Sequence, residues 1–99
     1  MLSFDMKSPL DIIMDVSQRM RRRRIDSNLT QRELAARSNI SYSSLRLFEE
    51  TGKISLESLV KIAFVLGAQG EFENLFPARP PRTIDDVVER PARQRARRK

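Results

Sequence analysis

The sequence predicts an all-α domain of five short helices, residues 8–76, followed by a basic tail, residues 77–99. Polar residues that favour helix N-termini stand before four stretches in which apolar residues recur every three or four positions. The composition then changes at three prolines, Pro77, Pro80 and Pro81. Because 99 residues bury only a modest core, we expect one folded unit and a mobile tail.

We expect the first helix to run from Pro9 to about Ile25. Ser8 is a good N-cap, and proline is well tolerated at the first helical position. Apolar side chains then recur on one side of the helix, at Ile12, Ile13, Val16 and Met20. The helix ends in four consecutive arginines, residues 21–24, which fan around its axis, so we expect about two of them to make contacts.

A second, shorter helix is expected to start at Gln31. Thr30 and Glu33 have the spacing of a capping box, in which each side chain satisfies a backbone N–H near the other. The apolar face lasts about two turns before Ser38 and Asn39 interrupt it. Asparagine tolerates left-handed backbone, so we expect a tight turn there.

The third helix is expected from Tyr42 to Glu50. Ser41 can cap its start, and Gly52 suits the left-handed residue just beyond its end. Helical spacing directs two side chains inward, Leu45 and Phe48, and three outward, Tyr42, Ser43 and Arg46.

Ser55 can cap a fourth helix, Leu56 to Leu66. Its apolar stripe is expected to lie in the core and consists of Leu59, Ile62, Ala63 and Leu66. A short fifth helical turn is expected from Glu71 to Phe76, with Leu75 and Phe76 covering the core before Pro77 stops the helix.

The tail beyond Pro77 carries one further helical pattern and a basic end. Thr83 and Asp86 have the spacing of an N-cap and its partner, among the apolar residues Ile84, Val87 and Val88. From Arg90 onward the chain has six positive charges and no acid. Two interpretations stay open for this end: a solvated, disordered terminus, or an arm that follows DNA phosphates or meets an acidic protein surface.

Composition points to a polyanionic partner. Nineteen Lys and Arg against thirteen Asp and Glu give a net charge of +6 and an isoelectric point near 10.7, typical of nucleic-acid-binding domains. No apolar run approaches the ~20 residues of a membrane span and no signal-peptide pattern opens the chain, so we expect a soluble cytoplasmic protein with no membrane partner. The sequence has neither Cys nor His, so we expect no metal site, no cofactor and no enzymatic activity.

The predicted helices 31–38 and 42–50, joined by a brief turn, have the helix-turn-helix arrangement, in which the second helix lies in the major groove of DNA. The residues Leu29-Thr30-Gln31-Arg32-Glu33-Leu34-Ala35 and Ile40-Ser41-Tyr42-Ser43-Ser44-Leu45-Arg46-Leu47-Phe48-Glu49 resemble the phage-repressor (Cro/C1, XRE) helix-turn-helix family. This resemblance implies a compact lambda-repressor-like domain that binds double-stranded operator DNA.

The resemblance also implies site residues. Its base-reading positions correspond to Ser41, Tyr42, Ser43 and Arg46. Its phosphate-binding positions correspond to Gln31 with its backbone N–H, to Ser44 and to Lys53, and Arg22 is expected to add to the phosphate contacts. Arg46 is the best candidate for specificity, because a guanidinium can bond both O6 and N7 of guanine. Arg24 and Glu49 are implied to form a structural ion pair between the first and third helices.

Two residues depart from the family pattern. Asn39 replaces the usual glycine of the turn, which is a mild change. Leu47 stands where many relatives have a polar base-contacting residue, and its side chain suits the methyl group of thymine instead.

A wider pattern, residues 21–30, 52–59, 75–77 and 83–88, resembles the HipB-like antitoxins encoded beside HipA-type kinase toxins. This resemblance implies a homodimer that represses its own operon and assembles with a HipA-like kinase toxin and a third small subunit. An apolar patch for dimerisation is available from Phe64, Phe72 and Leu75. Two alternatives stay open: a protein-binding antitoxin subunit whose main role is to complex the toxin, and a stand-alone phage-type repressor with no toxin.

Overall fold

The computed structural model describes residues 6–80, which form five α-helices and no strand. The helices are α2 (Pro9–Asp26), α3 (Gln31–Ser38), α4 (Tyr42–Thr51), α5 (Leu56–Val65) and α6 (Gln69–Glu73). The predicted all-α, five-helix fold is therefore confirmed. The first four helices end within one residue of their predicted bounds, whereas α6 begins two residues earlier than predicted and ends three residues earlier. The helical turn expected at Thr83–Val88 lies outside the described residues.

The predicted helix caps are present. The side chains of Ser8, Thr30, Ser41 and Ser55 each accept a hydrogen bond from the backbone N–H three residues later, at 3.0–3.1 Å. The caps at Ser8 and Thr30 are complete capping boxes. Asn39 and Gly52 both adopt left-handed backbone, with φ 58° and 84°, so local sequence signals set most of the helix ends.

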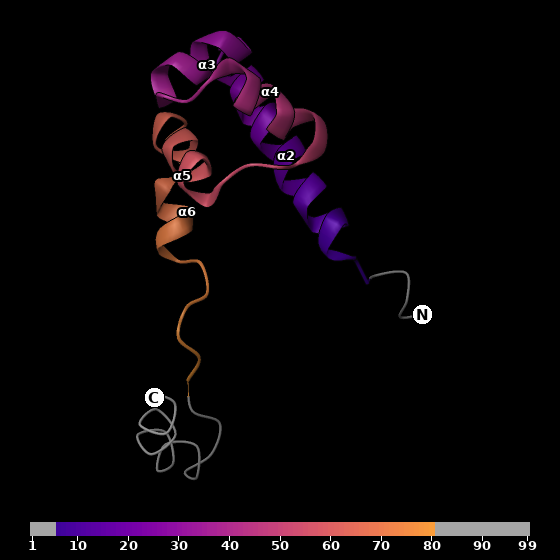
Figure 1. The fold of residues 1–99 in the computed structure, drawn as a ribbon. Helices are drawn as coiled ribbons and strands as arrows, with labels where there is room; N and C mark the ends of the chain where they lie inside the picture. Colours follow the sequence, from indigo (N-terminus) through magenta and orange to yellow (C-terminus); the bar gives the residue numbers. More distant parts are fainter. Residues whose placement is uncertain (1–5, 81–99) are drawn as a thin grey trace, which may run out of the picture.

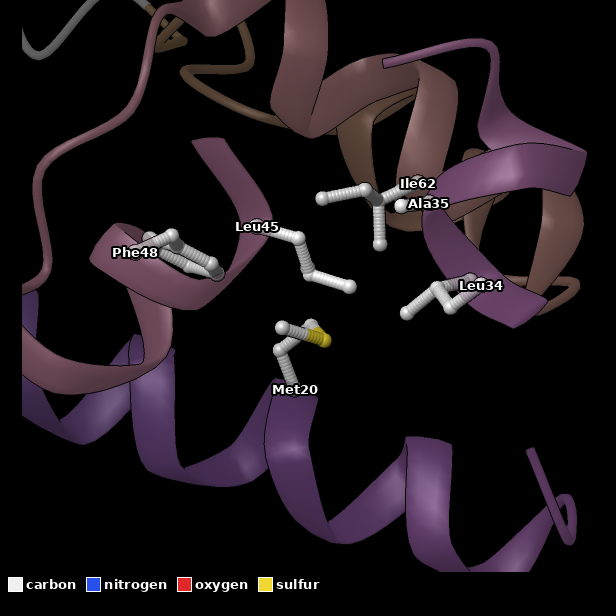
Figure 2. Close-up of a cluster of buried hydrophobic side chains, with 6 residues drawn as sticks. All are labelled: Met20, Leu34, Ala35, Leu45, Phe48 and Ile62. Atoms are coloured by element: carbon white, nitrogen blue, oxygen red, sulfur yellow. The ribbon is translucent and has the colours of Figure 1, made fainter. Parts of the chain in front are cut away.

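Four helices meet in one small apolar core (Figure 2). Its buried side chains are Met20 from α2, Leu34 and Ala35 from α3, Leu45 and Phe48 from α4, and Ile62 from α5. Helix α3 packs against both α4 and α5, and α2 packs against α4. In Figure 1, α3 lies at one end of the molecule, while α2 and the pair α5 and α6 extend from it on two sides.

A buried serine that the sequence analysis did not single out joins α2 to the end of α4. Ser17 is fully buried, and its hydroxyl donates to the carbonyl oxygen of Phe48 at 2.8 Å. A buried hydroxyl without a partner is destabilising, so this bond fixes the position of α2 along the end of α4.

Several apolar side chains are exposed, and the two predictions that Leu75 and Phe76 cover the core are wrong. The apolar side of α2 is not covered along its whole length: Ile12 is 52% exposed and Ile13 is exposed as well, because the first turns of α2 extend beyond the core. Phe76 does not cover the core but is 90% exposed, and Leu75 is also exposed. The reason is that α6 ends at Glu73 and the chain then turns through left-handed backbone at Phe76, which directs it away from the helices.

Gly52 offers a test of the contact between α2 and the end of α4. A Cβ at this position would overlap with Cγ2 of Ile13, whereas a Cβ at Gly67, which has a similar positive φ, would meet no atom within 4 Å. We expect Gly52→Ala to lower the free energy of unfolding by about 1–3 kcal/mol more than Gly67→Ala, as measured in urea, because overpacking adds to backbone strain. Adding Ile13→Ala should recover part of the loss; equal losses for the two glycine variants would contradict this packing.

Candidate nucleic-acid interface

Helices α3 and α4 are joined by a short turn around Asn39. The Asn39 N–H donates to Ala36 O at 3.2 Å, and the Ile40 N–H donates to Ala35 O at 3.1 Å. These bonds satisfy two of the last carbonyl groups of α3. The half-buried Ile40 also packs against the core, so the turn holds the two helices at a fixed angle.

A buried carboxylate, that of Glu49, connects three helices. Arg24 of α2 bonds it through two nitrogens, with Nε 2.6 Å from Oε2 and Nη2 2.9 Å from Oε1. Gln31 of α3 donates from Nε2 to Oε1 at 2.8 Å. Arg24 also donates to the carbonyl oxygen of Leu29 at 2.9 Å. The Arg24 and Glu49 side chains are only 10% and 3% exposed, so the pair that the family resemblance implies is a buried, bidentate contact.

The family resemblance implies that Gln31 and its backbone N–H hold a phosphate, and the structure directs these two groups to different places. The side-chain amide of Gln31 is bonded to Glu49, within the protein. The capping box satisfies the N–H groups of Thr30 and Glu33, and the backbone N–H groups of Gln31 and Arg32 have no acceptor within residues 6–80. Two donors at the positive end of a helix dipole make a suitable place for a phosphate.

The carboxylate of Glu33 holds the start of α3. A hydrogen bond from the backbone N–H of Thr30, and a second from its hydroxyl, lower the pKa of Glu33 below its ordinary value. Because the pKa is lowered in the folded state, the cap contributes its full stabilisation at a pH above the ordinary pKa of glutamate. This stabilisation is lost as the pH falls through the lowered pKa. The geometry at the start of α3 is therefore intact at neutral pH.

On α4, Ser43, Arg46, Leu47 and Glu50 are exposed. The Arg46 side chain is 58% exposed, and its Nε lies 3.2 Å from Oε2 of Glu50, one turn along the same helix. An exposed pair of this kind is weak, so Glu50 does not hold the Arg46 guanidinium against a competing acceptor. Leu47 is exposed, as contact with a thymine methyl group requires.

The expectation that Tyr42 points away from the protein is right only in part. Tyr42 is half-buried and packs against the core, and the guanidinium carbon of Arg32 lies 4.0 Å from the centroid of its ring. This cation–π contact spans the turn between α3 and α4. Arg32 is exposed at the start of α3, and the sequence analysis missed it because its contact with Tyr42 joins two helices and has no local spacing signal.

Two serines at the start of α4 bond to each other. The Ser41 hydroxyl donates to Oγ of Ser44 at 2.8 Å, while its oxygen accepts the Ser44 N–H at 3.0 Å. Ser41 therefore serves first as the N-cap of α4. Because Ser44 accepts in this arrangement, its own hydroxyl proton is available for an acceptor such as a phosphate oxygen.

The four arginines at the end of α2 all contact carboxylates, so the expectation of about two contacts is wrong. Arg21 lies 3.8 Å from Glu49, Arg22 lies 3.3 Å from Asp26, and Arg23 lies 2.6 Å from Glu71, in addition to the pair between Arg24 and Glu49. Arg22, an expected phosphate ligand, is thus in a highly exposed pair on its own helix, which is weak in water. Lys53, next to Gly52, is exposed.

Residues 20–70, just over half of the 99-residue chain, match the model of the helix-turn-helix family. This chain belongs to the helix-turn-helix family. The match supports an XRE-type DNA-binding regulator, and it includes the whole of α3 and α4. Among curated proteins, none matches the chain significantly. In the part of this helix-turn-helix protein that the structure describes, no helix is long and apolar enough to cross a membrane.

The Glu49 contacts predict a large difference between buried and exposed ion pairs. We expect Glu49→Ala to lower the free energy of unfolding in urea by about 3–5 kcal/mol, because it leaves the Arg24 charge buried without a partner. Asp26→Ala, which removes the exposed partner of Arg22, is the matched control. It should change the free energy of unfolding by less than about 1 kcal/mol. Similar losses for the two variants would contradict the structural role of Glu49.

Proposed function

We propose that this helix-turn-helix protein is a sequence-specific repressor that places α4 in the major groove of operator DNA. The observation that carries the proposal is the exposed set Ser43, Arg46 and Leu47 on α4, together with the N–H groups at the start of α3, which have no acceptor within residues 6–80. An α-helix fits the major groove, where each base pair presents a distinct pattern of donors, acceptors and methyl groups. Occupation of a promoter by the bound protein then blocks transcription.

In this proposal the residues divide into two roles. Arg46 reads a guanine and Leu47 contacts a thymine methyl, while Ser43 and the exposed part of Tyr42 approach neighbouring base edges. Phosphates bind to the N–H groups of Gln31 and Arg32, to the Ser44 hydroxyl, and to Lys53 and Arg22. Arg22 is supported least by the geometry, because Asp26 already lies beside it.

The proposal includes a homodimer on a palindromic operator. A two-fold pair of α4 helices would enter successive major grooves about one helical turn apart. Phe64 is 62% exposed and Leu75 is also exposed, while Phe72 is half-buried, so these residues offer an apolar patch at the end of the domain that carries α5 and α6. Sedimentation with and without operator DNA would measure the stoichiometry.

Two substitutions separate base reading from phosphate binding. We expect Arg46→Ala to lower the affinity for operator DNA by about 1–3 kcal/mol and to weaken the preference for operator over scrambled duplexes. Lys53→Ala should weaken binding to both duplexes alike and reduce the salt slope of log K by about one. Competition binding at several salt concentrations measures both quantities, with Glu57→Ala on α5 as a control outside the interface. Equal losses on both duplexes for Arg46→Ala would contradict the base-reading role.

We further propose the narrower role of a HipB-like antitoxin that binds a HipA-like kinase toxin and a third small subunit, and represses its own operon. The support for this role is the sequence resemblance over residues 21–30, 52–59, 75–77 and 83–88. Coexpression with the adjacent reading frames tests it: a copurifying kinase supports the antitoxin, whereas repression without one favours the stand-alone phage-type repressor. Removing residues 78–99 then tests the protein-binding alternative, which requires loss of the toxin with DNA affinity unchanged.

A further inference from the structure

The side chain of Arg32 is held by an aromatic ring across the turn between α3 and α4. Its guanidinium carbon lies 4.0 Å from the centroid of the Tyr42 ring. An N–H bond directed at the ring would keep that carbon farther away, so the guanidinium lies along the face of the ring. Tyr42 is half-buried and packs against the core, which fixes the ring and, through it, the long side chain of Arg32.

This contact leaves the donors of Arg32 available. The N–H bonds of a guanidinium lie in its own plane, so a ring against its face uses none of them. Within residues 6–80 the Arg32 guanidinium has no hydrogen-bond acceptor and no carboxylate partner. The next residue, Glu33, is bonded to Thr30 instead. Arg32 therefore presents a full set of donors that the described part of the protein does not satisfy.

An anion can bind to Arg32 without breaking an ion pair. Arg46 lies 3.2 Å from Glu50, and Arg22 lies 3.3 Å from Asp26, so each of these arginines must leave a carboxylate before it binds another acceptor. Arg32 has no such carboxylate within the described residues, and the Tyr42 ring already sets its direction. Ordering a flexible side chain on binding lowers affinity by about two- to tenfold, a loss that a side chain ordered beforehand avoids.

The position of Arg32 favours a phosphate over a base as the acceptor. In a helix-turn-helix unit the first helix crosses the DNA backbone, while the second enters the groove. Arg32 is the second residue of α3, the first helix of this unit, and it is exposed. A guanidinium is planar and can donate to two oxygens of the same phosphate.

We propose that Arg32 binds a DNA phosphate through its guanidinium, and that the Tyr42 ring is a positioning group that holds Arg32 ready for this contact. The site rests on the proposed function, because it requires a duplex that lies against both α3 and α4. It gives Tyr42 a role that uses the face of its ring and does not use its hydroxyl.

Competition binding of the full-length protein to operator and scrambled duplexes tests the Arg32 contact. We expect Arg32→Gln to weaken both duplexes alike, by about tenfold, and to reduce the salt slope of log K by about one. Arg37→Gln is the matched control, because Arg37 is an exposed arginine on the same helix. Its loss should not exceed about twofold. A loss for Arg32→Gln that is confined to the operator would indicate base reading and would overturn the assignment of a phosphate.

A double-mutant cycle on the scrambled duplex, where base reading contributes little, tests the role of Tyr42. Tyr42→Leu should weaken binding by about two- to tenfold when Arg32 is present, and by less than about twofold when Arg32→Gln is present. Tyr42→Phe keeps the ring and should retain the affinity. A loss from Tyr42→Leu that is the same in both backgrounds would show a structural effect of the ring and would overturn its positioning role.

The contact can also be measured without DNA. In the ¹⁵N-labelled full chain, the Nε–H resonance of Arg32 should move when Tyr42→Leu removes the ring, and should stay in place with Tyr42→Phe. Equal losses for Arg32→Gln and Arg37→Gln in the binding experiment would overturn this site while DNA binding by α4 stands. If the unchanged protein binds neither duplex at low salt, the proposed function fails and this site fails with it.

Discussion

The hydrogen bonds to the buried carboxylate of Glu49 are the interaction on which the arrangement of α2, α3 and α4 depends. This carboxylate is almost fully removed from solvent, and Arg24 of α2 and Gln31 of α3 both donate to it. A charge in that position is tolerated only when its hydrogen bonds are complete, which restricts the relative positions of the three helices that supply them. The main effect of this contact is therefore to select one packing of α2, α3 and α4, and its net contribution to stability is secondary.

The interface follows from this restriction. With Glu49 pointing inward on α4, the opposite side of that helix presents Arg46 and Leu47 to solvent. With the Gln31 side chain turned to Glu49, the backbone N–H groups at the start of α3 lie beside α4 with no acceptor within residues 6–80. The cation–π contact between Arg32 and Tyr42 spans the same two helices from outside. The groups that we propose to read bases and bind phosphates are thus held on one rigid unit.

Much of the fold could be predicted from local sequence because its signals are local. A cap such as Thr30 acts on N–H groups within one turn, and a left-handed residue such as Asn39 acts on its own backbone, so both can be read without knowing the tertiary structure. Burial is different. Ile12 has the spacing of a core residue but is half exposed, and Phe76 follows a helix that ends three residues earlier than its pattern suggests.

The same distinction holds for the site. The exposure of Ser43 and Arg46 on α4 could be predicted, since it depends on spacing along one helix. The bond from Gln31 to Glu49 and the contact of Arg32 with Tyr42 join different helices, and no spacing predicts them. The most direct test of the account is an NMR titration of the ¹⁵N-labelled chain with a short DNA duplex at low salt. We expect the largest amide shifts at Gln31, Arg32, Ser43 and Arg46, with α6 unchanged; shifts centred on α5 and α6 would contradict it.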